Sequence, residues 1–100
     1  LIDYNKIQAL SKIKDALPLD NLSKKFKAFN WDCTEVKNGH SFKEIISQFK
    51  SKNKKGIPRA IIFHTIKGKG IKQFENDPMW HARKIKGEEI NIGKKELKII

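Results

Sequence analysis

Hydrophobic positions along this chain follow two different periods that alternate, and the alternation predicts an α/β domain. Short runs at residues 1–4, 32–36 and 59–65 are typical of strands, and the first and last of them are mostly apolar. Between them, residues 18–29 and 41–52 place apolar side chains three and four residues apart, which is the spacing of one helical face. Strands joined through helices pair in parallel with right-handed crossovers. We therefore expect a three-stranded parallel sheet in the order strand, helix, strand, helix, strand.

Residues that favour helix ends mark the limits of the two predicted helices. Pro18 suits the first turn of the earlier helix, because the amides of that turn have no partner within the helix. Asn30 follows the last apolar residue of the stripe and tolerates the left-handed conformation that often ends a helix. Ser41 and Glu44 form a capping box, in which each side chain can accept a hydrogen bond from an amide at the start of the later helix.

The remaining segments carry weaker patterns. Residues 6–17 are predicted to be irregular or briefly helical, residues 71–90 to be mostly irregular, and residues 94–100 to form a short terminal helix. The chain starts with Leu1 rather than methionine, inside a predicted strand, and we expect a truncated start.

Composition narrows the class of protein. The 100 residues suffice for one domain, and the hydrophobic and charged fractions, 38% and 33%, are those of a globular chain without a membrane span. The net charge of +11 raises nucleic acid as a partner. Yet only Arg59 and Arg83 are arginines, which base and phosphate recognition favours, so we favour compositional drift over nucleic-acid binding as the source of the charge. Cys33 is the one cysteine; we expect it to be buried in a strand, in a protein of the reducing cytoplasm.

Polar residues follow two of the predicted strands, where parallel α/β sheets bind ligands. Asn5 comes directly after the first strand, and the Lys-Gly-Lys-Gly loop at residues 67–70 comes after the third. The side-chain oxygen of Asn5 and the backbone carbonyl of Ile7 can supply two oxygen ligands to a magnesium ion. His81 lies in a loop and can donate to a phosphate or substrate oxygen. Taken singly, each has a structural alternative: a turn cap for Asn5, an ordinary turn for the loop, and a packing role for His81.

The order of short motifs along the chain resembles the N-terminal, thiamine-diphosphate-binding subunit of split transketolases. The motifs are DYNKIQ, KFKAFNW, NGHSFKEI, HTIKGKG and ENDPMWH, and they cover residues 1 to about 90. They are similar to the C-terminal half of that subunit. The resemblance implies that residues 1–100 are the C-terminal portion of a doubly wound α/β domain, with thiamine diphosphate and magnesium as its cofactors.

Four residues acquire roles through this resemblance. Asn5 would bind magnesium through its side chain and touch the diphosphate, and Ile7 would bind magnesium through its backbone carbonyl. Ile66 would line the thiazolium, and His81 would act as a catalytic residue that contacts the diphosphate and the bound sugar. The chain departs from the family pattern in four places. Ala9-Leu10-Ser11 stands where Ile-Asp-Gly is usual, Asn30 stands where glycine is common, and Ala82 replaces a glycine after the histidine. The Gly-Asp-Gly segment that supplies a magnesium aspartate does not occur in these 100 residues.

The function that the resemblance implies is transfer of a two-carbon ketol unit between sugar phosphates. In split enzymes this work needs the C-terminal, pyrimidine-binding subunit, which supplies the activating glutamate, so we expect a larger oligomer and an inactive fragment. One alternative is a related enzyme, 1-deoxyxylulose-5-phosphate synthase, which also tolerates alanine after the histidine, although DYNKIQ fits transketolase better. The other alternative is a non-enzymatic basic domain that binds nucleic acid, which a steep salt dependence would reveal.

Overall fold

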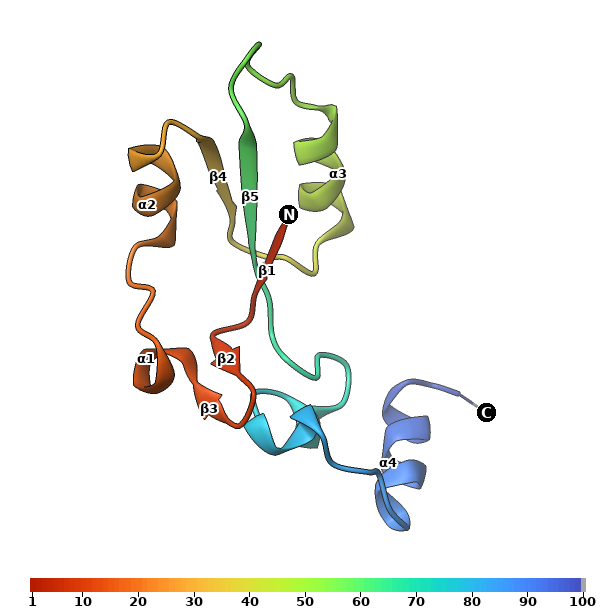
Figure 1. Ribbon diagram of the computed structural model, residues 1–100. Helices are drawn as coiled ribbons and strands as arrows, with labels where there is room; N and C mark the ends of the chain where they lie inside the picture. Colours follow the sequence, from red (N-terminus) through yellow and green to blue (C-terminus); the bar gives the residue numbers. More distant parts are fainter. Residues whose placement is uncertain (100) are drawn as a thin grey trace. The chain divides into compact units, whose positions relative to one another are not determined.

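The computed structural model describes residues 1–99, which form two compact units. The first, which we call the sheet unit, holds Leu1–Tyr4 and Leu17–Thr65 (Figure 1). The second unit holds Asn5–Ala16 and the chain from Ile66 onward. Among residues 1–99, no helix has both the length and the apolar character that crossing a membrane requires.

The sheet unit contains a parallel sheet of three strands, as the hydrophobic pattern predicts. The strands are β1 (Ile2–Tyr4), β4 (Asp32–Val36) and β5 (Arg59–His64), and their order across the sheet is β1, β5, β4. Both neighbouring pairs are parallel, and Tyr4 lies beside His64 in the register. The α/β class and the parallel sheet are therefore confirmed, whereas the doubly wound sheet of a complete domain stays a prediction.

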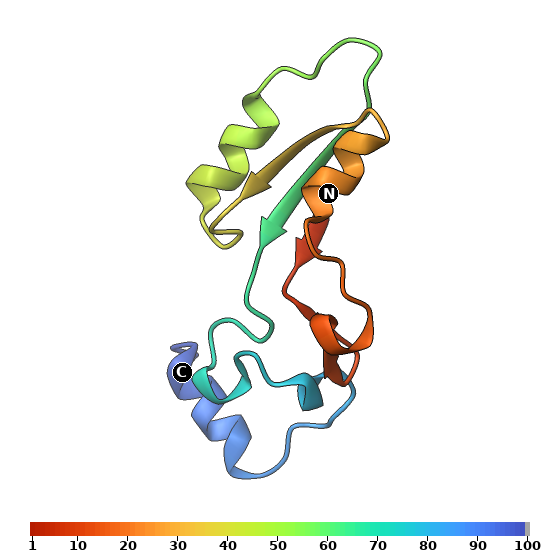
Figure 2. The ribbon, with the colours of Figure 1, turned by 90° about the vertical axis from the view of Figure 1, so that its left-hand side faces the viewer.

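Two helices, α2 (Leu22–Ala28) and α3 (Phe42–Lys50), cover opposite faces of this sheet (Figures 1 and 2). The connection through α2 runs from β1 past β5 to β4, and the connection through α3 runs back from β4 to β5. Right-handed crossovers that run in opposite directions across a sheet put their helices on opposite faces. The strand order therefore accounts for the two-sided packing and for the burial of the central strand.

Two apolar clusters, one on each face of the sheet, hold the sheet unit together. On the α2 side the buried members are Cys33, Ala60 and Ile62, with Ile2, Tyr4, Leu22 and Phe26 packed against them. On the α3 side they are Val36, Ile61 and Phe63, with Ile45 packed against them. Ile62, with an exposed fraction of 1%, is the deepest of these side chains. The burial of Cys33 in β4 confirms its predicted place in a strand.

The earlier helix starts later than the sequence predicts, at Leu22 rather than Pro18. Asn21 caps it, because its side-chain oxygen accepts a hydrogen bond of 2.8 Å from the amide of Lys24. This bond satisfies an amide that has no partner within the helix, and it fixes the start at that point. The predicted end is confirmed: Asn30 has a φ of +62°, in the left-handed region.

The capping box of α3 forms only in part. The Ser41 hydroxyl accepts a hydrogen bond of 3.3 Å from the Glu44 amide, as predicted. The Glu44 carboxylate accepts a bond from the amide of Asn38, also at 3.3 Å, while the Ser41 amide donates to the Asn38 carbonyl at 3.0 Å. The glutamate therefore ties the preceding turn to the helix, and α3 ends at Lys50 rather than at residue 52.

The second unit begins with a hairpin that the sequence pattern does not reveal. Strands β2 (Ile7–Gln8) and β3 (Ser11–Lys12) pair in antiparallel register, and the one-turn helix α1 (Ile13–Ala16) follows. The expectation of irregular or briefly helical structure over residues 6–17 is correct for α1 and wrong for the hairpin. Strands of two residues are too short to show an alternating pattern.

Two short 3-10 helices and one α-helix make up the rest of the second unit. They are η1 (Lys72–Phe74), η2 (Pro78–His81) and α4 (Glu88–Glu96). The predicted terminal helix over residues 94–100 is wrong in its bounds, and residue 100 lies outside the described residues. Helix α4 carries acidic residues in its first turn and lysines in its last, which complements the helix dipole. Few of its residues are apolar, so its hydrophobic pattern is weak.

Candidate functional site

Two of the four predicted site residues lie directly beyond adjacent strands of the parallel sheet. Strands β1 and β5 are neighbours, and the amide of Thr65 donates to the carbonyl of Tyr4 at 3.4 Å where the two strands end. Asn5 is the residue after Tyr4, and Ile66 is the residue after Thr65. The structure therefore puts both residues just past the carboxyl edge of the sheet, where α/β domains bind ligands.

Asn5 is half-buried and its side chain forms a tight local turn. Its side-chain oxygen accepts a hydrogen bond of 2.9 Å from the amide of Ile7. Lys6 between them has a φ of +64°. The turn cap that the sequence allows for Asn5 is thus present. It also fixes the direction of the side chain, and the amide oxygen keeps a second lone pair that can bind a ligand.

The oxygens of Asn5 and Ile7 fit the neutral part of a magnesium shell. Magnesium takes six oxygen ligands and is usually held through one or two carboxylates and substrate phosphates. Among residues 1–99, no three His, Cys, Asp or Glu side chains lie together in a way that could hold a metal ion. On their own, these two neutral oxygens lack the carboxylate with which proteins usually hold magnesium.

The Lys-Gly-Lys-Gly loop at residues 67–70 packs closely against η1. Gly68 has a φ of +74°, and a Cβ at this position would lie 2.3 Å from the carbonyl oxygen of Phe74. The amide of Asn76 donates to the carbonyl of Lys67 at 2.9 Å. Glycine is required at Gly68 by this approach of backbone to backbone, a packing reason that the sequence alone does not distinguish from room for a ligand.

His81 is the last residue of η2 and is exposed. Asp77 caps η2, since its carboxylate accepts a hydrogen bond of 2.9 Å from the amide of Met79. Within residues 1–99, the His81 imidazole has no hydrogen-bonding partner. The packing role considered for this histidine therefore does not fit its exposure, and both ring nitrogens are available for hydrogen bonds to a ligand.

The sheet unit holds a small polar cavity that sequence reasoning passed over. It has a volume of about 100 Å³ and lies where β4 and β5 meet the start of α2. Nε2 of His64 lies 2.7 Å from the Glu35 carboxylate, and the ring of Tyr4 packs edge-on against the imidazole. The hydrogen bond with His64, supported by Ser23, lowers the pKa of Glu35 below 4.5 despite partial desolvation. His64 is the last residue of β5, and its pairing with Glu35 gives it a structural role.

A parallel α/β sheet whose candidate site residues lie just beyond two adjacent strands is the architecture of many cofactor-binding domains. The sequence model of the family described as "Transketolase, thiamine diphosphate binding domain" matches residues 1–99. The chain belongs to this family and is a transketolase-like thiamine-diphosphate-binding domain. The resemblance to split transketolases that the motifs carry is thereby confirmed.

Individual relatives agree with the family. The chain is 35% identical over 96 residues to an apulose-4-phosphate transketolase subunit of Actinobacillus succinogenes, covering 96% of this chain and 34% of that protein. It is 36% identical over 87 residues to the 6-deoxy-6-sulfo-D-fructose transketolase subunit SqwG of a Clostridium species, covering 86% and 31%. It is 31% identical over 83 residues to the transketolase of Homo sapiens, covering 83% and 13%. The chain spans about a third of the length of these bacterial relatives.

Proposed function

We propose that this chain takes part in the transfer of a two-carbon ketol unit between sugar phosphates, as a portion of a thiamine-diphosphate-binding transketolase subunit. The observation that carries the proposal is the family match over residues 1–99. It is supported by relatives named as transketolase subunits of the split kind. Thiamine diphosphate, when bound, supplies the carbanion chemistry, so the protein has to bind, orient and neutralise it.

Asn5 and Ile7 are proposed to hold the magnesium ion that accompanies the diphosphate. The turn between them supports this role, because it fixes the amide oxygen of Asn5 through a hydrogen bond of 2.9 Å with Ile7. A side chain held in this way loses little freedom when it binds an ion. Two neutral oxygens do not balance the charge of a divalent ion. We propose that the carboxylate comes from a segment outside these 100 residues.

Ile66 and His81 are proposed to contact the cofactor itself. Ile66 is half-buried just past the end of β5 and offers an apolar surface to the thiazolium. The exposed imidazole of His81 can donate a hydrogen bond to the diphosphate and to a sugar oxygen. The net charge of +11 favours the approach of anionic sugar phosphates, since a positive field raises the local concentration of anions.

A second, different polypeptide is part of the proposal, because the bacterial relatives of this chain are named as single subunits of transketolases. We propose a hetero-oligomer in the cytoplasm, in which the pyrimidine-binding subunit supplies the glutamate that activates the thiazolium. This chain alone then lacks a complete active site.

The test is steady-state kinetics of the complete subunit with its partner, against both cofactor and sugar phosphate. Asn5→Ala is expected to weaken magnesium-dependent cofactor binding roughly 10- to 100-fold, a range typical for lost groups at metal sites. His81→Ala is expected to lower turnover and sugar affinity while it leaves magnesium dependence unchanged. Lys52→Ala is the control, since Lys52 is exposed and lies in the sheet unit. Cofactor binding by Asn5→Ala equal to that of the control would refute the assignment of the magnesium ligand.

A further inference from the structure

Next to His81, a network of aromatic and charged side chains joins η2 to helix α4. The guanidinium carbon of Arg83 lies 3.9 Å from the centre of the Trp80 ring. The Trp80 ring in turn packs on Phe74, with 3.8 Å between ring centres. Phe74 is buried, with an exposed fraction of 7%. Trp80, the residue before His81, therefore has a cation on its ring and a buried aromatic partner.

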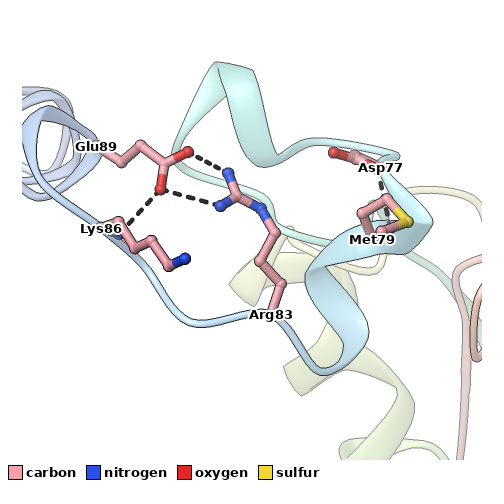
Figure 3. A network of polar contacts seen from close by, with 5 residues as sticks. All are labelled: Asp77, Met79, Arg83, Lys86 and Glu89. Atoms are coloured by element: carbon pink, nitrogen blue, oxygen red, sulfur yellow. Dashed lines mark hydrogen bonds and ion pairs between the residues drawn. The ribbon is translucent and has the colours of Figure 1, made fainter.

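Arg83 is itself held from α4. Both terminal nitrogens of its guanidinium donate to the two carboxylate oxygens of Glu89, which is a paired, two-pronged contact (Figure 3). Glu89 lies in the first turn of α4, and its carboxylate also accepts a hydrogen bond of 3.0 Å from the amide of Lys86. The hydrogen bond from Arg83 is the main reason why the pKa of Glu89 is lowered. The arginine is therefore oriented on both sides, by Trp80 and by Glu89.

This arrangement matters because no other residue among 1–99 makes a polar contact with the His81 side chain. With no hydrogen-bonding partner within residues 1–99, the imidazole is placed by the backbone of η2 and by the residues beside it. Residues 83–86 after it belong to neither helix nor strand. Contacts from Arg83 to Trp80 and to Glu89 span this stretch and reach α4. They connect the backbone on the C-terminal side of the histidine to α4.

We propose that Arg83 is a positioning residue that sets the direction of the His81 imidazole through Trp80 and Glu89. The inference rests on the proposed function, in which His81 contacts the diphosphate and the sugar. Glu89 neutralises the guanidinium charge, so Arg83 acts through geometry rather than as a separate anion-binding group. A reacting group misplaced by about 1 Å can lose about 100-fold in rate, which is why such support matters for an exposed histidine.

Kinetics of the complete subunit with its partner test whether Arg83 acts through His81. Arg83→Gln and Glu89→Gln are each expected to lower kcat/KM roughly 10- to 100-fold. The kcat/KM of Arg83→Lys is expected to be intermediate between that of these variants and that of the wild type, because lysine keeps the charge but not the planar, bidentate contact. In a His81→Ala background, Arg83→Gln is expected to have no further effect on turnover. If Arg83→Gln lowered turnover in the His81→Ala background by the same factor as in the wild type, Arg83 would act independently of His81, and the proposal would be overturned.

Lys84→Gln is the matched control, because Lys84 is the exposed neighbour of Arg83 and has no polar partner within residues 1–99. It removes one positive charge from the same stretch and is expected to leave kcat/KM unchanged. A loss as large as that of Arg83→Gln would mean that charge alone matters, which contradicts positioning.

A second readout does not depend on activity. The NMR signals of the His81 imidazole, and the fluorescence of Trp80 in a Trp31→Phe background, are expected to change in Arg83→Gln and not in Lys84→Gln. Unchanged signals in Arg83→Gln would refute the positioning role even if the protein were an active transketolase. If the signals changed in Arg83→Gln but the wild-type protein had no ketol-transfer activity, the proposed function would be refuted, while the positioning of His81 by Arg83 would stand.

Discussion

Gly68 and Gly56 form a matched pair in which an alanine substitution separates backbone strain from steric clash. Their φ angles are +74° and +73°, so an added Cβ strains the backbone equally at both positions. At Gly68 the Cβ would lie 2.3 Å from the carbonyl oxygen of Phe74, whereas at Gly56 it would meet no heavy atom within 4 Å. Only Gly68→Ala therefore forces the loop at residues 67–70 away from η1.

The loss in the free energy of unfolding that each alanine substitution causes can be estimated from the φ angles and these contacts. A left-handed backbone costs an alanine about 1–2 kcal/mol, and the lower entropy of the unfolded chain offsets about 0.4–1 kcal/mol of this. Gly56→Ala is therefore expected to lower the free energy of unfolding by about 0.5–1 kcal/mol. Gly68→Ala adds an overpacking cost of about 1–3 kcal/mol, because the backbone must move for the clash to be relieved. We expect a total loss of about 1.5–4 kcal/mol at this position.

Urea unfolding followed by tryptophan fluorescence measures both losses, since each unit contains one of the two tryptophans. Trp80 reports on the second unit in a Trp31→Phe background, and Trp31 reports on the sheet unit in a Trp80→Phe background. The midpoint for Gly68→Ala is expected to shift at least twice as far as that for Gly56→Ala. Equal losses of about 1 kcal/mol would mean that backbone strain alone acts, and would refute the close packing of the loop on Phe74.

Two further predictions concern the sheet unit. The pKa of Glu35 lies below its ordinary value of 4.5, so the stability it contributes is fully present above that pH and is lost as the pH falls through the lower folded-state pKa. Glu35→Gln is expected to flatten this acid loss in urea unfolding between pH 3 and 6, and an unchanged acid slope would contradict the pairing with His64. Ile62→Ala, in the centre of the sheet, is expected to cost about 2–5 kcal/mol, whereas Phe42→Ala, at a side chain that is 80% exposed, should change stability by less than about 0.5 kcal/mol. Similar losses for these two variants would mean that the core lies elsewhere.

The central strand could be predicted from sequence because burial on both faces leaves a continuous apolar run. Residues 60–63 form such a run, and they are buried in the central strand. Local capping was harder to predict. Pro18 and Asn21 both favour a helix start, and only the structure shows that the side chain of Asn21 receives the hydrogen bond that decides between them.

The candidate site could be predicted only in part. The positions of Asn5 and Ile66 follow from strand ends, which the sequence marks well, while their ligands and that of His81 stay predictions. The network around Arg83 escapes sequence reasoning for a physical reason. Its partner Glu89 is six residues away across an irregular stretch, a separation that matches neither helical nor strand periodicity. One signal was present in the sequence: Arg83 is one of only two arginines in a chain otherwise rich in lysine.

The second unit is assembled from two pieces, Asn5–Ala16 and the chain from Ile66 onward, with the whole of Leu17–Thr65 between them. During synthesis the first piece therefore leaves the ribosome long before its partner exists. The second unit, which contains Asn5, Ile7 and His81, can form only after the sheet residues and then the chain from Ile66 onward have been synthesised. Contacts between distant parts of a chain form late because loop closure costs entropy first. Translation that stops before residue 66 would therefore yield the complete sheet unit but only the first piece of the second unit, Asn5–Ala16.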